Sequence, residues 1–133
     1  MTKRTHHSEY LKLSSVYIKT AKDAFESDIN IGNQWNDLNY LSKPNFNLAI
    51  NEYENFESIF IKNDVSVYHF PFKEKVKMDS IYCRDASIAT DFGMIICNMG
   101  KEGRMNEPEI QLEEFESKNI QILGIIEAPG TLE

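Results

Sequence analysis

The chain has 133 residues, 41% of them hydrophobic and 26% charged, which suits one globular domain with its own core. Its 14 basic and 21 acidic residues give a net charge of −7, which argues against a nucleic-acid groove, because such a groove needs a basic face. No apolar run is long enough to span a bilayer, and the N-terminus lacks the apolar stretch of a secretory signal. We therefore predict a cytoplasmic protein with no nucleic-acid or membrane partner.

The first half of the chain is predicted to contain two strands and one long helix. Residues 11–19 and 65–70 have the composition and alternation of strands. Residues 45–63 predict a helix, because apolar side chains recur along one face at helical spacing. These are Ala49, Tyr53, Phe56 and Phe60. Residues 20–44 are polar but carry several aromatic side chains, so we interpret them as an ordered insertion.

The second half begins with a predicted β-hairpin. Residues 80–90 and 93–99 are apolar runs, and Gly93 marks the turn between them. Residues 106–119 predict a helix, with a proline near its first turn and acids that suit the positive end of the helix dipole. Residues 120–128 predict a final strand. The second half therefore predicts a β-β-α-β unit, and the first half a variant whose second strand is replaced or lies within residues 20–44.

The residues that most often bind metals give no such signal. Cys83 and Cys97 lack metal-ligand spacing, and we interpret them as buried thiols. His6 and His7 lie in a polar tail, and His69 is interpreted as a packed or solvent-facing strand residue. The sequence thus predicts no metal site and no cofactor.

An acid within the first apolar run is harder to explain. Strand alternation puts Asp85 on the face of Ile81 and Cys83, with Arg84 on the opposite face. A carboxylate there must meet water, hydrogen-bond donors or a cation. One interpretation is that Arg84 and Asp85 are a charged pair at a strand end and face solvent. Asp79 would then be a turn residue. The other is a binding site for a cation.

Three motifs favour the binding site. They are the Arg84-Asp85 pair, an arginine nineteen positions later followed by Asn-Glu-Pro (Arg104 and residues 106–108), and Ala-Pro-Gly-Thr-Leu-Glu at residues 128–133. Together they resemble the arginine-modifying, or pentein, superfamily of amidinotransferases, arginine deiminases and dimethylarginine dimethylaminohydrolases. The resemblance extends upstream through Gln34-Trp35 and residues 49–56.

This resemblance implies an α/β fold, a partial pentein propeller with about two of its five β-β-α-β units, a mixed sheet and helices outside. Residues 1–133 would be the N-terminal part of a single catalytic domain, with residues 20–44 as a polar insertion. The substrate implied is a small guanidino compound such as arginine. The remaining partner is expected to be the rest of the propeller or a second copy of the chain.

The resemblance also implies roles for particular residues. Asp85 and Glu133 match carboxylates that hold the substrate guanidinium. A carboxylate can accept two parallel hydrogen bonds from the N–H groups of a guanidinium. Asp79 matches an acid near the substrate amine, and Arg104 matches the arginine that pairs with the substrate carboxylate. Arg84 departs from the acid that many dimethylargininases have there and is closer to deiminases and amidinotransferases.

The covalent chemistry of this superfamily uses a nucleophilic cysteine and a proton-transferring histidine. Both follow the position of Glu133 in the family pattern, so we expect them outside this chain. The predicted function is therefore the N-terminal segment of an amidino-group hydrolase or transferase, inactive alone. One alternative is a non-catalytic module that binds guanidino compounds or has a regulatory role. Another is a structural α+β domain with accidental motifs.

Overall fold

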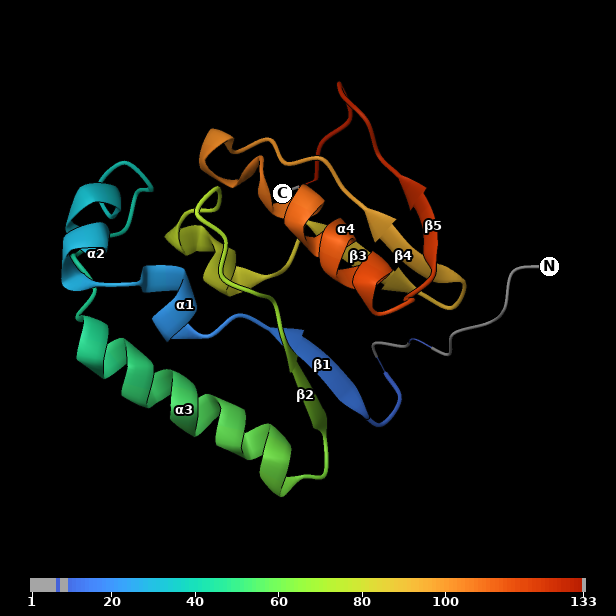
Figure 1. Ribbon diagram of the computed structural model, residues 1–133, viewed down its shortest axis with the longest axis horizontal. Helices are drawn as coiled ribbons and strands as arrows, with labels where there is room; N and C mark the ends of the chain where they lie inside the picture. The colour runs from blue at the N-terminus through green and yellow to red at the C-terminus, as the bar shows by residue number, and fades with distance from the viewer. Residues whose placement is uncertain (1–6, 8–9, 133) are drawn as a thin grey trace. The chain divides into compact units, whose positions relative to one another are not determined.

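A computed structural model describes residues 7 and 10–132, so His6 and Glu133 lie outside the described residues. The chain divides into two compact units, which are described separately. The first unit is Leu13–Cys83, and the second contains the described residues from Arg84 onward together with those before residue 13. Figure 1 labels the elements of both.

Two short parallel strands and three helices make up most of the first unit. Strands β1 (Ser15–Ile18) and β2 (Ser66–His69) pair in parallel, so that Ser15 lies opposite Ser66. A parallel pair needs a long crossover, which here consists of the helices between them. The helices are α1 (Ala21–Phe25), α2 (Asp28–Gln34) and α3 (Phe46–Lys62). A 3-10 helix, η1 (Met78–Tyr82), follows β2.

The polar stretch at residues 20–44 is ordered, as predicted, and supplies much of this unit's core. Helices α1 and α2 begin where Thr20 and Ser27 accept hydrogen bonds from backbone N–H groups three residues on, at 3.1 Å each. Their apolar side chains pack with Leu38 and Met78 in one buried cluster, against which Trp35 also lies. The described part of this stretch contains no strand, so no hidden second strand is found there.

Helix α3 agrees with the predicted helix at residues 45–63 to within one residue at each end, because Asn45 and Asn63 are its caps. The Asn45 side chain accepts a hydrogen bond from the Leu48 N–H at 2.9 Å, and Asn63 follows the last turn. The apolar stripe is present, with edge-to-face contacts between Phe56 and its neighbours Tyr53 and Phe60. None of the helix residues is fully buried, so this stripe is only partly covered by the first unit.

The second unit is the predicted β-β-α-β arrangement (Figure 1). Strands β3 (Ser87–Thr90) and β4 (Gly93–Ile96) form an antiparallel hairpin, and β5 (Ile122–Ile125) pairs in parallel with β4. Helix α4 (Glu107–Ser117) makes the crossover between β4 and β5, preceded by a short 3-10 helix, η2 (Glu102–Arg104). It packs on the sheet through a buried face that includes Ile110 and Phe115.

The predicted strand at residues 80–90 is largely wrong. Residues Met78–Tyr82 are a 3-10 helix, and β3 begins only at Ser87. In between, Cys83 and Asp85 have positive φ angles of 58° and 69°, which a strand does not contain. The predicted alternation of side chains around Asp85 is therefore also wrong, and Asp85 lies in a bend that leads into β3.

Candidate functional site

The carboxylate of Asp85 is held at the entrance to β3. Its side chain is 21% exposed, while the next residue, Ala86, is completely buried and its carbonyl oxygen accepts a hydrogen bond from Cys97 N at 3.0 Å. The buried Ala86 and this hydrogen bond fix the backbone immediately after Asp85. A partly exposed carboxylate thus projects from a well-anchored bend.

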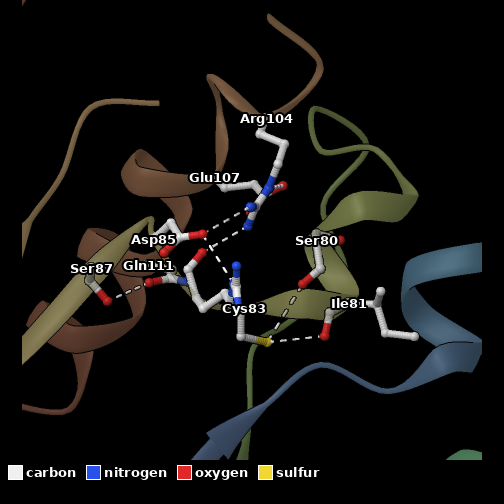
Figure 2. Close-up of polar contacts among 9 residues, drawn as sticks. Ser80, Ile81, Cys83, Asp85, Ser87, Arg104, Glu107 and Gln111 are labelled. Carbon is white, nitrogen blue, oxygen red and sulfur yellow. Dashed lines mark hydrogen bonds and ion pairs between the residues drawn. The ribbon is translucent and has the colours of Figure 1, made fainter. Parts of the chain in front are cut away.

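Arg104 and Glu107 form a two-pronged ion pair where η2 leads into α4 (Figure 2). Arg104 Nε donates to Glu107 Oε1 at 2.9 Å, and Arg104 Nη2 donates to Glu107 Oε2 at 2.8 Å. Both residues are buried, with exposed fractions of 7% and 3%. Parallel charge-assisted hydrogen bonds of this kind fix the plane of a guanidinium group.

The same guanidinium group reaches the bend that carries Asp85. Arg104 Nη2 donates to the carbonyl oxygen of Arg84 at 2.8 Å, and Nη1 lies 3.8 Å from Asp85 Oδ2. The Arg84 side chain, which is 79% exposed, donates from Nε to the same carboxylate oxygen at 3.2 Å. Asp85 therefore already meets two guanidinium groups of its own chain, one buried and one exposed.

A polar contact on the other side of the bend ties the sheet to the helix. The Ser87 hydroxyl, at the start of β3, donates to Gln111 Oε1 of α4 at 2.6 Å (Figure 2). Gln111 is buried, with 4% of its surface exposed. This contact fixes β3 against the helix whose first residue is Glu107.

Of the four predicted site residues, two meet in the second unit. These are Asp85 and Arg104. Asp79 belongs to the first unit, where it is almost fully buried in η1. Burial raises the pKa of the nearby Tyr40, and Tyr82 and Asp79 raise it further. Glu133 lies outside the described residues.

Both cysteines lie within the described residues and are thiols rather than a disulfide. Burial raises the pKa of the Cys97 thiol, and the negative charge of Asp85 raises it further. A raised pKa keeps a thiol protonated and poorly nucleophilic. Among the described residues, no group of three or more histidine, cysteine or acidic side chains is arranged to hold a metal ion.

A model of one protein family matches residues 19–130, and its description is N,N dimethylarginine dimethylhydrolase, eukaryotic. The chain belongs to this family. It is thereby a member of the pentein superfamily, as its motifs predict. A comparison with curated protein sequences found no match.

Solved structures of dimethylarginine dimethylaminohydrolases have the same fold. One is a dimethylarginine dimethylaminohydrolase variant in an adduct with S-methyl-L-thiocitrulline, and another is a cysteine-to-serine mutant from Pseudomonas aeruginosa complexed with citrulline. Each is 24% identical to this chain with a TM-score of 0.69, over 92% of this chain and 45% of the other. The mixed α/β pentein fold is therefore confirmed, and the chain spans a little under half the length of these relatives.

Sequence reasoning missed two buried polar residues of this dimethylargininase-family chain. Glu107 was predicted only to suit the helix dipole, yet it binds Arg104 in a fork. Its spacing of three residues from Arg104 at a predicted helix start was the available signal. Gln111 had no comparable signal, because its partner Ser87 is 24 residues away.

Among the described residues, the helices are too short or too polar to span a bilayer.

Proposed function

We propose that the chain is part of an amidino-group hydrolase that acts on an arginine derivative, and that it supplies residues that hold the substrate guanidinium. Asp85 is the principal carboxylate of this site, with Glu133 as its expected second carboxylate. Asp79 is assigned to the substrate amine and Arg104 to the substrate carboxylate. The family match over residues 19–130 supports the reaction class.

The observation that carries this proposal is the contact between Asp85 and Arg84. Asp85 Oδ2 accepts a hydrogen bond from a guanidinium group, that of Arg84, at 3.2 Å. The bend therefore already presents the carboxylate in an orientation in which such a group can reach it. A ligand guanidinium would displace the exposed Arg84 side chain, which a surface ion pair holds only weakly.

The covalent chemistry is assigned to a cysteine and a histidine that this chain does not supply. The thiolate would add to the guanidinium carbon, the substituted amine would leave with a proton, and water would then release the ureido product and restore the thiol. The raised pKa of Cys97 supports this assignment, because a buried thiol of raised pKa is a poor nucleophile. Citrulline and S-methyl-L-thiocitrulline, which the solved relatives hold, indicate an α-amino acid as the ligand class.

Calorimetry with the 133-residue chain tests the binding role. L-Arginine, dimethylarginine and citrulline would be titrated into the natural chain and into the variant Asp85→Asn, which keeps the shape of the side chain. Loss of a charge-assisted contact predicts binding weaker by about tenfold or more. Asp91→Asn, an acid of the β3–β4 turn, is the matched control and should bind normally. Equal affinities for Asp85→Asn and the natural chain would contradict the proposal.

The same preparations test the assignment of the chemistry. We expect no release of citrulline, ornithine or amine when the chain is incubated with arginine or dimethylarginine. Turnover that persists in Asp85→Asn would overturn both the inactivity and the role of Asp85. Turnover that Asp85→Asn abolishes would keep Asp85 in the site but move the nucleophile into this chain.

A further inference from the structure

Two acids and one buried cation meet in the second unit, and they share that cation unequally. Glu107 takes two hydrogen bonds from Arg104, at 2.9 and 2.8 Å, whereas Asp85 lies 3.8 Å from the nearest Arg104 nitrogen. The longer separation lies beyond hydrogen-bond range. Arg104 is therefore engaged mainly by Glu107.

The fork also fixes what the rest of the guanidinium does. With Nε and one hydrogen of Nη2 directed to Glu107, the other Nη2 hydrogen points to the carbonyl oxygen of Arg84. That carbonyl belongs to the peptide bond that leads into Asp85, whose φ of 69° is an unfavourable angle for most residues. Arg104 therefore contacts both Glu107 and the backbone next to Asp85.

We propose that Glu107 is a positioning residue for the guanidinium site, which rests on the proposed function. It holds Arg104 in the fork and so prevents that arginine from closing a direct pair with Asp85. The carboxylate of Asp85 then stays available to the guanidinium of a ligand. Without the fork to Glu107, the buried arginine turns to Asp85, which already lies 3.8 Å from its Nη1.

The favourable effect of an acid on the helix dipole would not by itself keep Arg104 away from Asp85. Glu109 lies in the same first turn of α4, is exposed, and suits the helix dipole as well as Glu107 does. Glu109→Gln is therefore the matched control for Glu107→Gln. Both variants remove one acid from the turn, but only Glu107→Gln removes the fork.

The ligand for the test is agmatine, a guanidinium compound without a carboxylate, so that any contact of Arg104 with a ligand carboxylate is absent. Binding to the full 133-residue chain would be followed by amide NMR, which also reports whether each variant is folded. We expect Glu107→Gln to bind agmatine about tenfold more weakly, the loss of one charge-assisted contact, and Glu109→Gln to bind normally.

A double variant separates positioning from a merely structural role. Arg104→Gln combined with Glu107→Gln replaces the ion pair by two amides and removes the competing cation, so agmatine affinity should return to within about threefold of the natural chain. Agmatine affinity unchanged in Glu107→Gln, or still lost in the double variant, would overturn the proposal. If Glu107→Gln does not fold, Glu107→Asp replaces it, because its shorter side chain keeps the charge but cannot complete the fork, and weaker binding is expected.

A crystal structure of the Glu107→Gln variant supplies a readout that needs no ligand. The Arg104 Nη1–Asp85 Oδ2 separation should fall from 3.8 Å to hydrogen-bond distance. An unchanged separation would refute the positioning role even if agmatine bound as expected. Conversely, a shortened separation in a chain whose natural form binds neither agmatine nor arginine would support the positioning of Asp85 while refuting the proposed function.

Discussion

Gly93 and Gln121 approach so closely that no side chain fits between them. A β-carbon on Gly93 would lie 2.7 Å from the carbonyl oxygen of Gln121, which accepts a hydrogen bond from Met94 N at 2.8 Å. Gly93 also has a φ of 130°, an angle that side-chain-bearing residues rarely adopt. The amide of the Gln121 side chain in turn donates to the carbonyl oxygen of Phe92. The end of the hairpin turn and the start of β5 are thus joined by one backbone hydrogen bond and one from the Gln121 side chain.

Gly93→Ala should therefore destabilise the chain markedly. The strained angle alone costs of the order of 1–3 kcal/mol, and the steric clash adds to it. Urea denaturation measures the change in the free energy of unfolding. Gly124→Ala is the control, because a β-carbon at Gly124 would meet no atom within 4 Å, and we expect no loss of stability there. Equal losses in the two variants would contradict this reading of the contact.

Removal of Arg104 should cost far more than removal of its neighbour Arg84. Arg104→Ala leaves Glu107 buried without its cation, which predicts a loss of about 3–5 kcal/mol. Arg84→Ala removes only an exposed ion pair and should cost about 0–1 kcal/mol. Thermal and urea denaturation of the two variants make the comparison. A small effect of Arg104→Ala would mean that Glu107 is solvated in solution.

Stability should fall at alkaline pH. Burial raises the pKa values of Tyr40 and Tyr53, and also that of Cys97. The folded chain therefore keeps protons that the unfolded chain releases above about pH 8.5 for cysteine and about pH 10 for tyrosine. Unfolding is favoured as pH rises through that range, whereas below it these groups have no effect on the pH dependence.

The alkaline loss can be assigned to particular residues. Melting temperatures measured from about pH 8 to about pH 11 should fall less steeply in Tyr40→Phe and Tyr53→Phe than in the natural chain. The Tyr40 hydroxyl is buried and makes no hydrogen bond of normal geometry with the described residues, so its removal should cost little at neutral pH. Identical pH profiles in all three proteins would refute the assignment.

The two cysteines should differ in reactivity. Cys97 is 2% exposed and burial raises its pKa, whereas Cys83 is only partly buried. An alkylating reagent at neutral pH should modify Cys83 first and Cys97 only when the chain unfolds, as mass spectrometry of the peptides would show. Asp85→Asn should lower the pKa of Cys97 in part, because burial, the larger cause, remains. Equal rates at the two thiols would show that Cys97 is reached by local opening.

Sequence reasoning succeeded where a local signal and the final packing agree. Helix α3 was predicted from its apolar period and from Asn45, which caps it as expected. The hairpin was predicted from Gly93, whose angle and contacts demand glycine. The start of α4 was predicted from Pro108, which lies in its first turn. In each case the residue that gave the signal performs the same physical role in the structure.

The failures have equally specific causes. The apolar composition of residues 80–90 suggested a strand, but the left-handed angles of Cys83 and Asp85 leave no trace in an apolar pattern. Helices α1 and α2 were missed because each is too short to show a helical apolar period, although Thr20 and Ser27 were available as cap signals. The role of Glu107 depends on a partner shared with Asp85, and one-dimensional spacing does not reveal such a competition.

The backbone angle at Asp85 restricts which residues can replace it. A left-handed angle costs most side-chain-bearing residues about 1–2 kcal/mol, whereas glycine, asparagine and aspartate tolerate it. Glycine and asparagine carry no charge, and a longer acid would bring its own backbone penalty. The substitutions that this backbone angle tolerates, glycine and asparagine, therefore remove the carboxylate. A substitution that keeps the negative charge strains the backbone, so this position cannot change its residue without losing either the charge or stability.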